Sequence, residues 1–170
     1  MRRGRAMALL VLAIALLVPS SLIWYRGHYA MRVARSFSAG APSSAQRVLL
    51  ATQGSPFKEA LVAGLVAHLR SRPVYVSVID VSGLPGVKEG DWSAIVVIHT
   101  WEYSQPQADA RAFIDRLSDR SKLIVVTTSG SGDARMPGVD AISAASVMDE
   151  PPMPLAKVAR RLDALLDAAR

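Results

Sequence analysis

Cysteine is absent from this 170-residue sequence. The absence excludes disulfide scaffolds, zinc ribbons, thiolate iron–sulfur clusters and cysteine nucleophiles. It says nothing about the compartment, because a cysteine-free domain works on either side of a membrane. Hydrophobic residues make up 51% of the chain, so there is enough apolar surface to exclude a disordered protein. The length suits about one ordinary domain.

Acidic residues are absent from the first 47 positions, which hold seven arginines. The remaining positions hold 13 basic and 14 acidic residues, so the net charge of +6 belongs to the N-terminal segment. A nearly neutral remainder lacks the basic face that binding to a phosphate backbone requires. The sequence therefore argues against a nucleic-acid-binding protein.

Charge is also absent from Ala6–Tyr25, a 20-residue apolar run that follows three arginines. A helix of this length spans about 30 Å, the hydrocarbon thickness of a bilayer. The aromatic pair Trp24 and Tyr25 stands at its far end, where amphipathic rings favour the membrane interface. We therefore expect residues 1–25 to form a single-span membrane anchor. The alternative is a cleaved signal peptide, with Val18-Pro19-Ser20 as a weak cleavage site.

The charges on both sides of the apolar run are nearly balanced, since three arginines precede it and Arg26, Arg32 and Arg35 follow it. The signal-like layout favours a cytoplasmic N-terminus, with the soluble domain on the outer, periplasmic side of the inner (plasma) membrane. Residues 26–46 predict a basic tether, helical over Arg26–Phe37, at the membrane surface. A flexible linker is expected over Ser38–Ser44.

From residue 47 to residue 170, short apolar runs alternate with helical patterns. The predicted strands are Val48–Ala51, Val74–Ile79, Ala94–Ile98, Leu123–Val126 and Val139–Ile142. The predicted helices begin at Ser55-Pro56, at Ser104–Gln107 and at Pro154. Continuously apolar strands are typical of parallel sheets that are buried on both faces. The pattern predicts an α/β fold, a doubly wound five-stranded parallel sheet with strand order 2-1-3-4-5.

In such a sheet, ligands bind beyond the carboxyl ends of the strands, between the first and third strands. The loop Thr52–Pro56 leads into a helix start, where backbone N–H groups suit an anion, and Lys58 adds charge there. The loop His99–Ser104 carries two aromatics that suit a planar ring. The loop Thr127–Asp133 offers backbone donors. We expect these three loops to meet at one edge of the sheet.

Residues 47–170 resemble the flavodoxin-like family of FMN-binding electron carriers and the related NAD(P)H-dependent flavin and quinone reductases. The resemblance lies in Val48–Phe57, Thr100–Ser104 and Thr127–Asp133, and it implies an FMN phosphate in the first loop and the isoalloxazine ring between the other two. The implied cofactor-binding residues are Thr52, Gln53, Gly54, Ser55, Thr100, Trp101, Tyr103, Thr128, Ser129, Gly130 and Gly132. The phosphate motif is degenerate, because Phe57 stands where flavodoxins have a hydroxyl residue. Gly54-Ser55-Pro56 is more similar to the turn of the reductases, although the arginine and later serines usual there are missing.

Two functions stay open at this point. One is a membrane-tethered flavoprotein that exchanges electrons with a quinone or a membrane partner, the flavin supplying the redox chemistry. The other is a binding or scaffold module that keeps the fold without flavin, which Phe57 and an outward-facing domain favour. His99 and Glu102 are candidates for an acid/base pair at the cleft, but the spacing fixes no nucleophile, so no catalytic residue is assigned. Three scattered histidines give no metal-ligand spacing.

Overall fold

The first helix, α1 (Arg2–Tyr29), forms most of an N-terminal unit that ends at Met31, as the computed structural model shows. The structure describes residues 2–29, 31–102, 105–145 and 152–169. Pro19 lies inside α1, and the large apolar side chains described between Val11 and Trp24 are more than half exposed. Within these described ranges, no helix is both long enough and apolar enough to cross a membrane. The span predicted over Ala6–Tyr25 therefore has no support from the structure.

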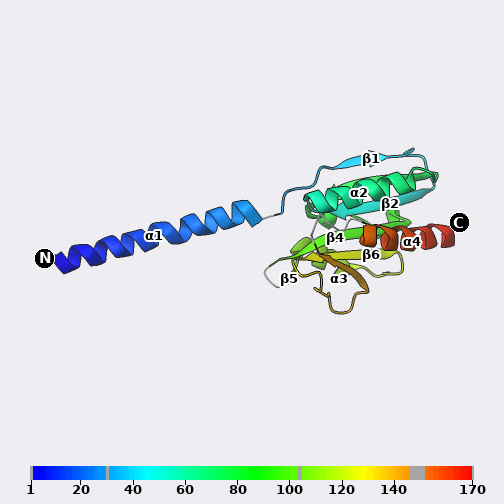
Figure 1. Ribbon diagram of the computed structural model, residues 1–170. Helices are drawn as coiled ribbons and strands as arrows, with labels where there is room; N and C mark the ends of the chain where they lie inside the picture. Colours follow the sequence, from blue (N-terminus) through cyan, green and yellow to red (C-terminus); the bar gives the residue numbers. More distant parts are fainter. Residues whose placement is uncertain (1, 30, 103–104, 146–151, 170) are drawn as a thin grey trace. The chain divides into compact units, whose positions relative to one another are not determined.

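The second unit, Arg32–Arg170, is built on a mostly parallel, mixed sheet, in which Figure 1 labels β1, β2, β4, β5 and β6. The strand order is β1-β3-β2-β4-β6-β7, and β5 pairs with β4. The strands are β1 (Phe37–Ala39), β2 (Gln46–Thr52), β3 (Val74–Asp80), β4 (Ala94–Glu102), β5 (Gln105–Pro106), β6 (Leu123–Ser129) and β7 (Ala141–Ala145). Strands β3, β2, β4, β6 and β7 are parallel neighbours. Their order is 2-1-3-4-5 when these five are counted along the chain, as predicted.

Two short antiparallel strands were not predicted. β1 pairs with β3 at the edge of the sheet, and β5 pairs with the end of β4. The prediction of an all-parallel, five-stranded sheet was therefore incomplete. A basic helix up to Phe37 and a linker from Ser38 were expected here. In the structure, α1 ends at Tyr29, and Phe37–Ala39 is a strand that hydrogen-bonds to β3. An edge strand has unpaired backbone groups, and β1 satisfies those of β3.

The helices are α2 (Pro56–Leu69), α3 (Ala108–Arg116) and α4 (Pro152–Ala168), and two short 3₁₀ helices follow β3, η1 (Val81–Gly86) and η2 (Glu89–Asp91). Ser55 caps α2 as predicted, since its side chain accepts from the backbone N–H of Lys58 at 3.3 Å. Gln107 caps α3 by accepting from the N–H of Ala110 at 2.7 Å. The predicted cap Ser104 lies outside the described residues.

Alternation along the strands produces two hydrophobic cores, one on each face of the sheet. On one face, Val96 and its even-numbered neighbours in β4 pack with apolar residues of α2 and α4. On the other face, Val97 and its odd-numbered neighbours pack with α3 and η1. The carboxyl ends of β2, β4 and β6 therefore lie at one edge, with helices covering both faces behind them.

Candidate functional site

The carboxyl ends of β2, β4 and β6 meet side by side, as the register of the parallel pairs shows. Thr52 is opposite Ile98, and Thr100 is opposite Thr128. Five polar residues come together at this edge: Gln53, Lys58, Thr100, Glu102 and Thr128. We call them the carboxyl-edge cluster. It contains residues from all three loops for which the sequence predicted a common edge.

The side chain of Gln53 continues the hydrogen bonding where the ladder between β2 and β4 ends. Its Oε1 accepts from the backbone N–H of Thr100 at 2.7 Å, and its Nε2 donates to Oε1 of Glu102 at 2.7 Å. Gln53 is itself buried. This amide therefore fixes the position of Glu102 relative to the end of β2.

Lys58 is fully buried in the first turn of α2. Its Nζ donates to the hydroxyl of Thr100, which in turn lies 3.2 Å from the hydroxyl of Thr128. Burial lowers the pKa of Lys58 to about 8, and the nearby carboxylate of Glu102 opposes that shift. Lys58 is thus a buried amine that titrates close to physiological pH.

His99 lies on the opposite face of β4 from Glu102, because successive strand side chains alternate. The ring is fully buried, with Nδ1 3.2 Å from the carbonyl oxygen of Thr100 and Nε2 3.2 Å from the hydroxyl of Thr127. Burial lowers the pKa of His99 to about 4; the hydrogen bond to Thr100 opposes the shift, and the charge of Lys58 adds to it. His99 is therefore neutral at pH 7 and does not form an acid/base pair with Glu102.

The backbone of Gly54, in the predicted phosphate turn, is paired with another part of the chain. Arg32 and Gly54 form an antiparallel bridge, in which the Gly54 N–H donates to the Arg32 carbonyl at 2.7 Å and the Arg32 N–H donates to the Gly54 carbonyl at 3.2 Å. We call residues 32–39 the strap, because this segment crosses the turn and continues into β1. A Cβ atom at Gly54 would lie only 2.8 Å from the carbonyl oxygen of Arg32, so no substituent fits between the two backbones.

Of the two aromatic residues expected to stack on a ring, the structure describes only Trp101. Trp101 is partly buried and packs against the core on the α3 side of the sheet. Tyr103 lies outside the described residues. Trp101 thus serves packing in this arrangement.

The loop after β6 folds back on the sheet. The Ser129 hydroxyl accepts from the N–H of Gly132 at 2.8 Å, and Gly132 has a φ of +78°. A Cβ atom on Gly132 would lie 2.7 Å from the backbone nitrogen of Ala145. Glycine is therefore required here by both conformation and close approach. Gly130 is exposed, with open space around it.

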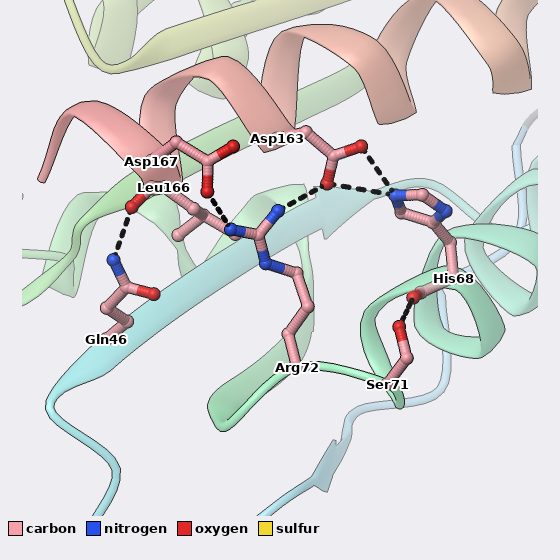
Figure 2. Close-up of polar contacts among 7 residues, drawn as sticks. All are labelled: Gln46, His68, Ser71, Arg72, Asp163, Leu166 and Asp167. Carbon is pink, nitrogen blue, oxygen red and sulfur yellow. Dashed lines mark hydrogen bonds and ion pairs between the residues drawn. The ribbon is translucent and has the colours of Figure 1, made fainter. Parts of the chain in front are cut away.

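A polar network at the other end of the sheet joins α2 to α4 (Figure 2). Nε2 of His68 lies 3.0 Å from Oδ2 of Asp163, and Arg72 donates to Oδ1 of Asp163 at 2.7 Å and also to Asp167. The hydroxyl of Ser71 donates to the backbone carbonyl of His68 and not to its ring. A serine–histidine–aspartate arrangement is therefore not formed, and the network has the character of a helix-to-helix clamp.

A surface hollow of about 450 Å³ also lies away from the carboxyl edge, between the starts of β6 and β7 and one side of α4. Its two arginines already have partners. Arg120 donates to the carbonyl of Gly138 at 3.3 Å, and Arg161 donates to Asp140 at 2.9 Å. Among the residues that the structure describes, no three His, Cys, Asp or Glu side chains are grouped to hold a metal ion.

An FMN phosphate at the first turn would need the free N–H groups of a helix start. The N–H of Gly54 is bonded to Arg32, and the hydroxyl of Ser55 caps α2. The residues present therefore do not fit the phosphate of FMN in this arrangement of the chain.

The sequence predicts only an added charge for Lys58, and it assigns residues 32–39 to a basic tether and linker and not to the site. The position of Lys58 three residues after the Ser55 cap was visible in the sequence, but its burial was not. For Arg32–Ala34, no pattern in the sequence indicates pairing with Gly54, because a single backbone bridge depends on geometry and not on side-chain type.

No family model matches the sequence, and no curated protein matches it. Solved structures do resemble the fold. The flavodiiron core of Flv1 from Synechocystis sp. PCC6803 is similar with a TM-score of 0.53 and 13% identity, over 74% of this chain and 37% of that one. An oxidoreductase from Corynebacterium diphtheriae is similar with a TM-score of 0.38 and 15% identity, over 72% of this chain and 93% of that one. The chain thus spans little more than a third of the flavodiiron core. Together with the strand order 2-1-3-4-5, the first likeness shows that the fold is flavodoxin-like.

Proposed function

We propose that the globular unit is a binding or scaffold module that keeps the flavodoxin-like fold without holding flavin. The observation that carries this proposal is the bridge between Gly54 and Arg32, which takes up the N–H of Gly54, a donor that a phosphate at this turn would need. A fold alone does not fix a function, so the proposal rests on the site and not on the likeness.

The carboxyl-edge cluster supports the same conclusion. Gln53 is hydrogen-bonded to both Thr100 and Glu102, and Lys58 is hydrogen-bonded to Thr100. A buried charge is tolerated when hydrogen bonds and an opposite charge surround it, and here Glu102 supplies that charge. The cluster therefore stabilises the end of the sheet from inside and does not need a bound anion to balance Lys58.

The test is an absorbance spectrum of the purified full chain, before and after incubation with FMN and removal of the excess by gel filtration. A flavodoxin treated in parallel serves as the positive control. We expect no flavin bands in the protein fraction at either stage. Flavin bands that co-elute with the chain at about one equivalent would overturn the proposal.

The second candidate is a redox module that binds FMN and passes electrons to or from a quinone or a membrane partner. The shared fold with the flavodiiron core and the convergence of three loops at one edge favour it. It requires an arrangement in which Arg32 has left Gly54. If flavin does bind, Gly54→Val should abolish binding, since a side chain there blocks close approach of a phosphate.

We also propose that α1 holds the protein at a membrane. The support is the uncharged run Ala6–Tyr25 and the exposed apolar side chains described within it. After cell fractionation, the full chain should stay in the membrane pellet through high salt and carbonate washes. Leu16→Arg should release it and Gly4→Arg, which adds the same charge outside the apolar run, should not. Release of the unaltered chain by salt alone would contradict this localisation, because salt screens charge and not apolar burial.

A further inference from the structure

The strap is attached to the globular unit mainly by its backbone. The bridge to Gly54 supplies two hydrogen bonds, and the N–H of Ala34 donates to Oδ2 of Asp80 at 2.7 Å. Beyond them, Phe37–Ala39 pairs with Val76–Val78 in β3. These contacts close the carboxyl edge over β2 and run on along the neighbouring β3.

Few of its side chains are buried. Val33 is 80% exposed and Phe37 is 43% exposed, whereas Ala34 is the small residue that turns inward. A segment with little buried apolar surface and few hydrogen bonds belongs to the least stable part of a fold and opens before the core does. The core strands beneath it are fully buried, Leu50 and Val96 among them.

The strap also begins at the residue that follows the N-terminal unit, which ends at Met31. A force that pulls on the N-terminal unit is therefore transmitted through the covalent chain first to Arg32 and its bridge to Gly54. At the other end of the strap, Gly40 has a φ of +83°, and a Cβ atom there would lie 2.2 Å from the carbonyl oxygen of Val74. This tight glycine turn fixes the far end of the strap, whereas the near end is held by the two hydrogen bonds to Gly54 and the one to Asp80.

We propose that residues 32–34 of the strap are a lid on the carboxyl edge, which opens by local unfolding while the sheet stays intact. Opening frees the N–H and the carbonyl of Gly54 and one oxygen of Asp80; the other oxygen still accepts from the N–H of Ser82 at 3.0 Å. The lid goes beyond the proposed function, because it concerns the segment that closes the carboxyl edge. The proposal of a lid does not depend on whether a ligand binds at the open edge.

Hydrogen exchange of the full chain, read at single amides across low urea concentrations, tests the lid directly. The amides of Arg32, Ala34 and Gly54 should exchange at least about 100-fold faster than that of Leu50, with little dependence on urea. Exchange of these amides at the rate of Leu50, with the same urea dependence, would show that the strap opens only when the domain unfolds and would overturn the proposal.

Gly54→Ala gives an independent test, because the added Cβ pushes against the carbonyl oxygen of Arg32 while the backbone of Gly54 does not require a positive φ. It should abolish protection at Arg32 and Ala34 and leave Leu50 unchanged. Gly90→Ala is the matched control, since a Cβ there meets nothing within 4 Å. Unchanged protection of Ala34 in Gly54→Ala would contradict the lid. If this variant fails to fold, the exchange pattern of the unaltered chain still decides. Neither result depends on FMN, so failure of the lid and failure of the proposed function are distinguishable.

Discussion

The backbone of Gly54 pairs with that of Arg32 through two hydrogen bonds, of 2.7 and 3.2 Å, at the turn where a flavodoxin-like fold offers its first ligand contact. The pair is an isolated antiparallel bridge, which gives the N–H of Gly54 a partner within the chain. It also ties a segment just after the N-terminal helix to the end of β2.

Lys58 should make stability depend on pH in the alkaline range. Its pKa is about 8 in the folded chain, mainly because of burial, and about 10.5 when the residue is exposed. Between these values the unfolded chain binds more protons, so the free energy of unfolding rises with pH, by about 3 kcal/mol in total. Urea denaturation at pH 7.5 to 10.5 measures this rise.

Lys58→Met is the comparison for that measurement, because it keeps the length of the side chain and removes the titrating group. The difference in unfolding free energy between the two proteins should grow in favour of the unaltered chain as pH rises. A difference that stays constant from pH 7.5 to 10.5 would mean that the ammonium group of Lys58 is well solvated in the folded protein.

His99 should make the stability of the protein depend on pH in the acid range. Burial holds its pKa at about 4, against about 6.5 when exposed. As pH falls from 6.5 to 4, the imidazole is protonated in the unfolded chain but not in the folded chain. The free energy of unfolding therefore falls by about 3 kcal/mol. His99→Gln should lose less over this interval in the same denaturation experiment. Equal losses in the two proteins would place the ring in contact with solvent.

Asp163 joins α2 to α4 through His68 and Arg72 (Figure 2). Burial alone would raise the pKa of Asp163, but the hydrogen bonds from His68 and Arg72 outweigh it, and the net effect lowers the pKa. The contribution is therefore present above the ordinary aspartate pKa and is lost as pH falls through the lowered value. At pH 7, Asp163→Asn should cost about 1 kcal/mol, discounted for partial exposure.

The matched control for Asp163 is Asp115→Asn in α3, which removes exposed ion pairs with Arg111, one turn earlier in α3, and with Arg120. That change should cost less than about 0.5 kcal/mol. Thermal or urea unfolding of both variants gives the comparison. An equal cost at both positions would contradict a clamp between the helices.

The two cores can be tested separately with Val96→Ala and Val125→Ala, since these residues lie on opposite faces of the sheet. Each should lower the free energy of unfolding by about 1–3 kcal/mol, through lost burial and a cavity. Unfolding curves that coincide with that of the unaltered chain at both sites would contradict the assignment of these strands to the core.

The parallel strands were predictable because each is a short apolar run bounded by turn residues, as Ala94–Ile98 illustrates. The start of α2 was predictable because Ser55 and Pro56 have well-known preferences for a cap and a first turn. Both signals are local. The fifth parallel strand was displaced in the prediction, from Ala141–Ala145 to Val139–Ile142, because small residues such as those of β7 give a weak strand pattern.

The strap and the burial of Lys58 were not predictable for a different reason. The pairing of Arg32 with Gly54, and of β1 with β3, uses backbone groups that every residue has. The burial of Lys58 depends on residues from β4 and β6 that meet it only after the sheet has formed. Neither feature leaves a periodic or compositional signal along the chain.

We infer that the chain itself occupies the turn around Gly54 and leaves no place for the phosphate of FMN there. Amide ¹H–¹⁵N correlation NMR spectra of the full chain, recorded while FMN is added, test this inference at Gly54 itself. We expect the amide signal of Gly54 to keep its position through a large excess of FMN, and the protection of the Ala34 amide from exchange to stay as it is without FMN. A saturable shift of the Gly54 signal, with loss of protection at Ala34, would contradict it.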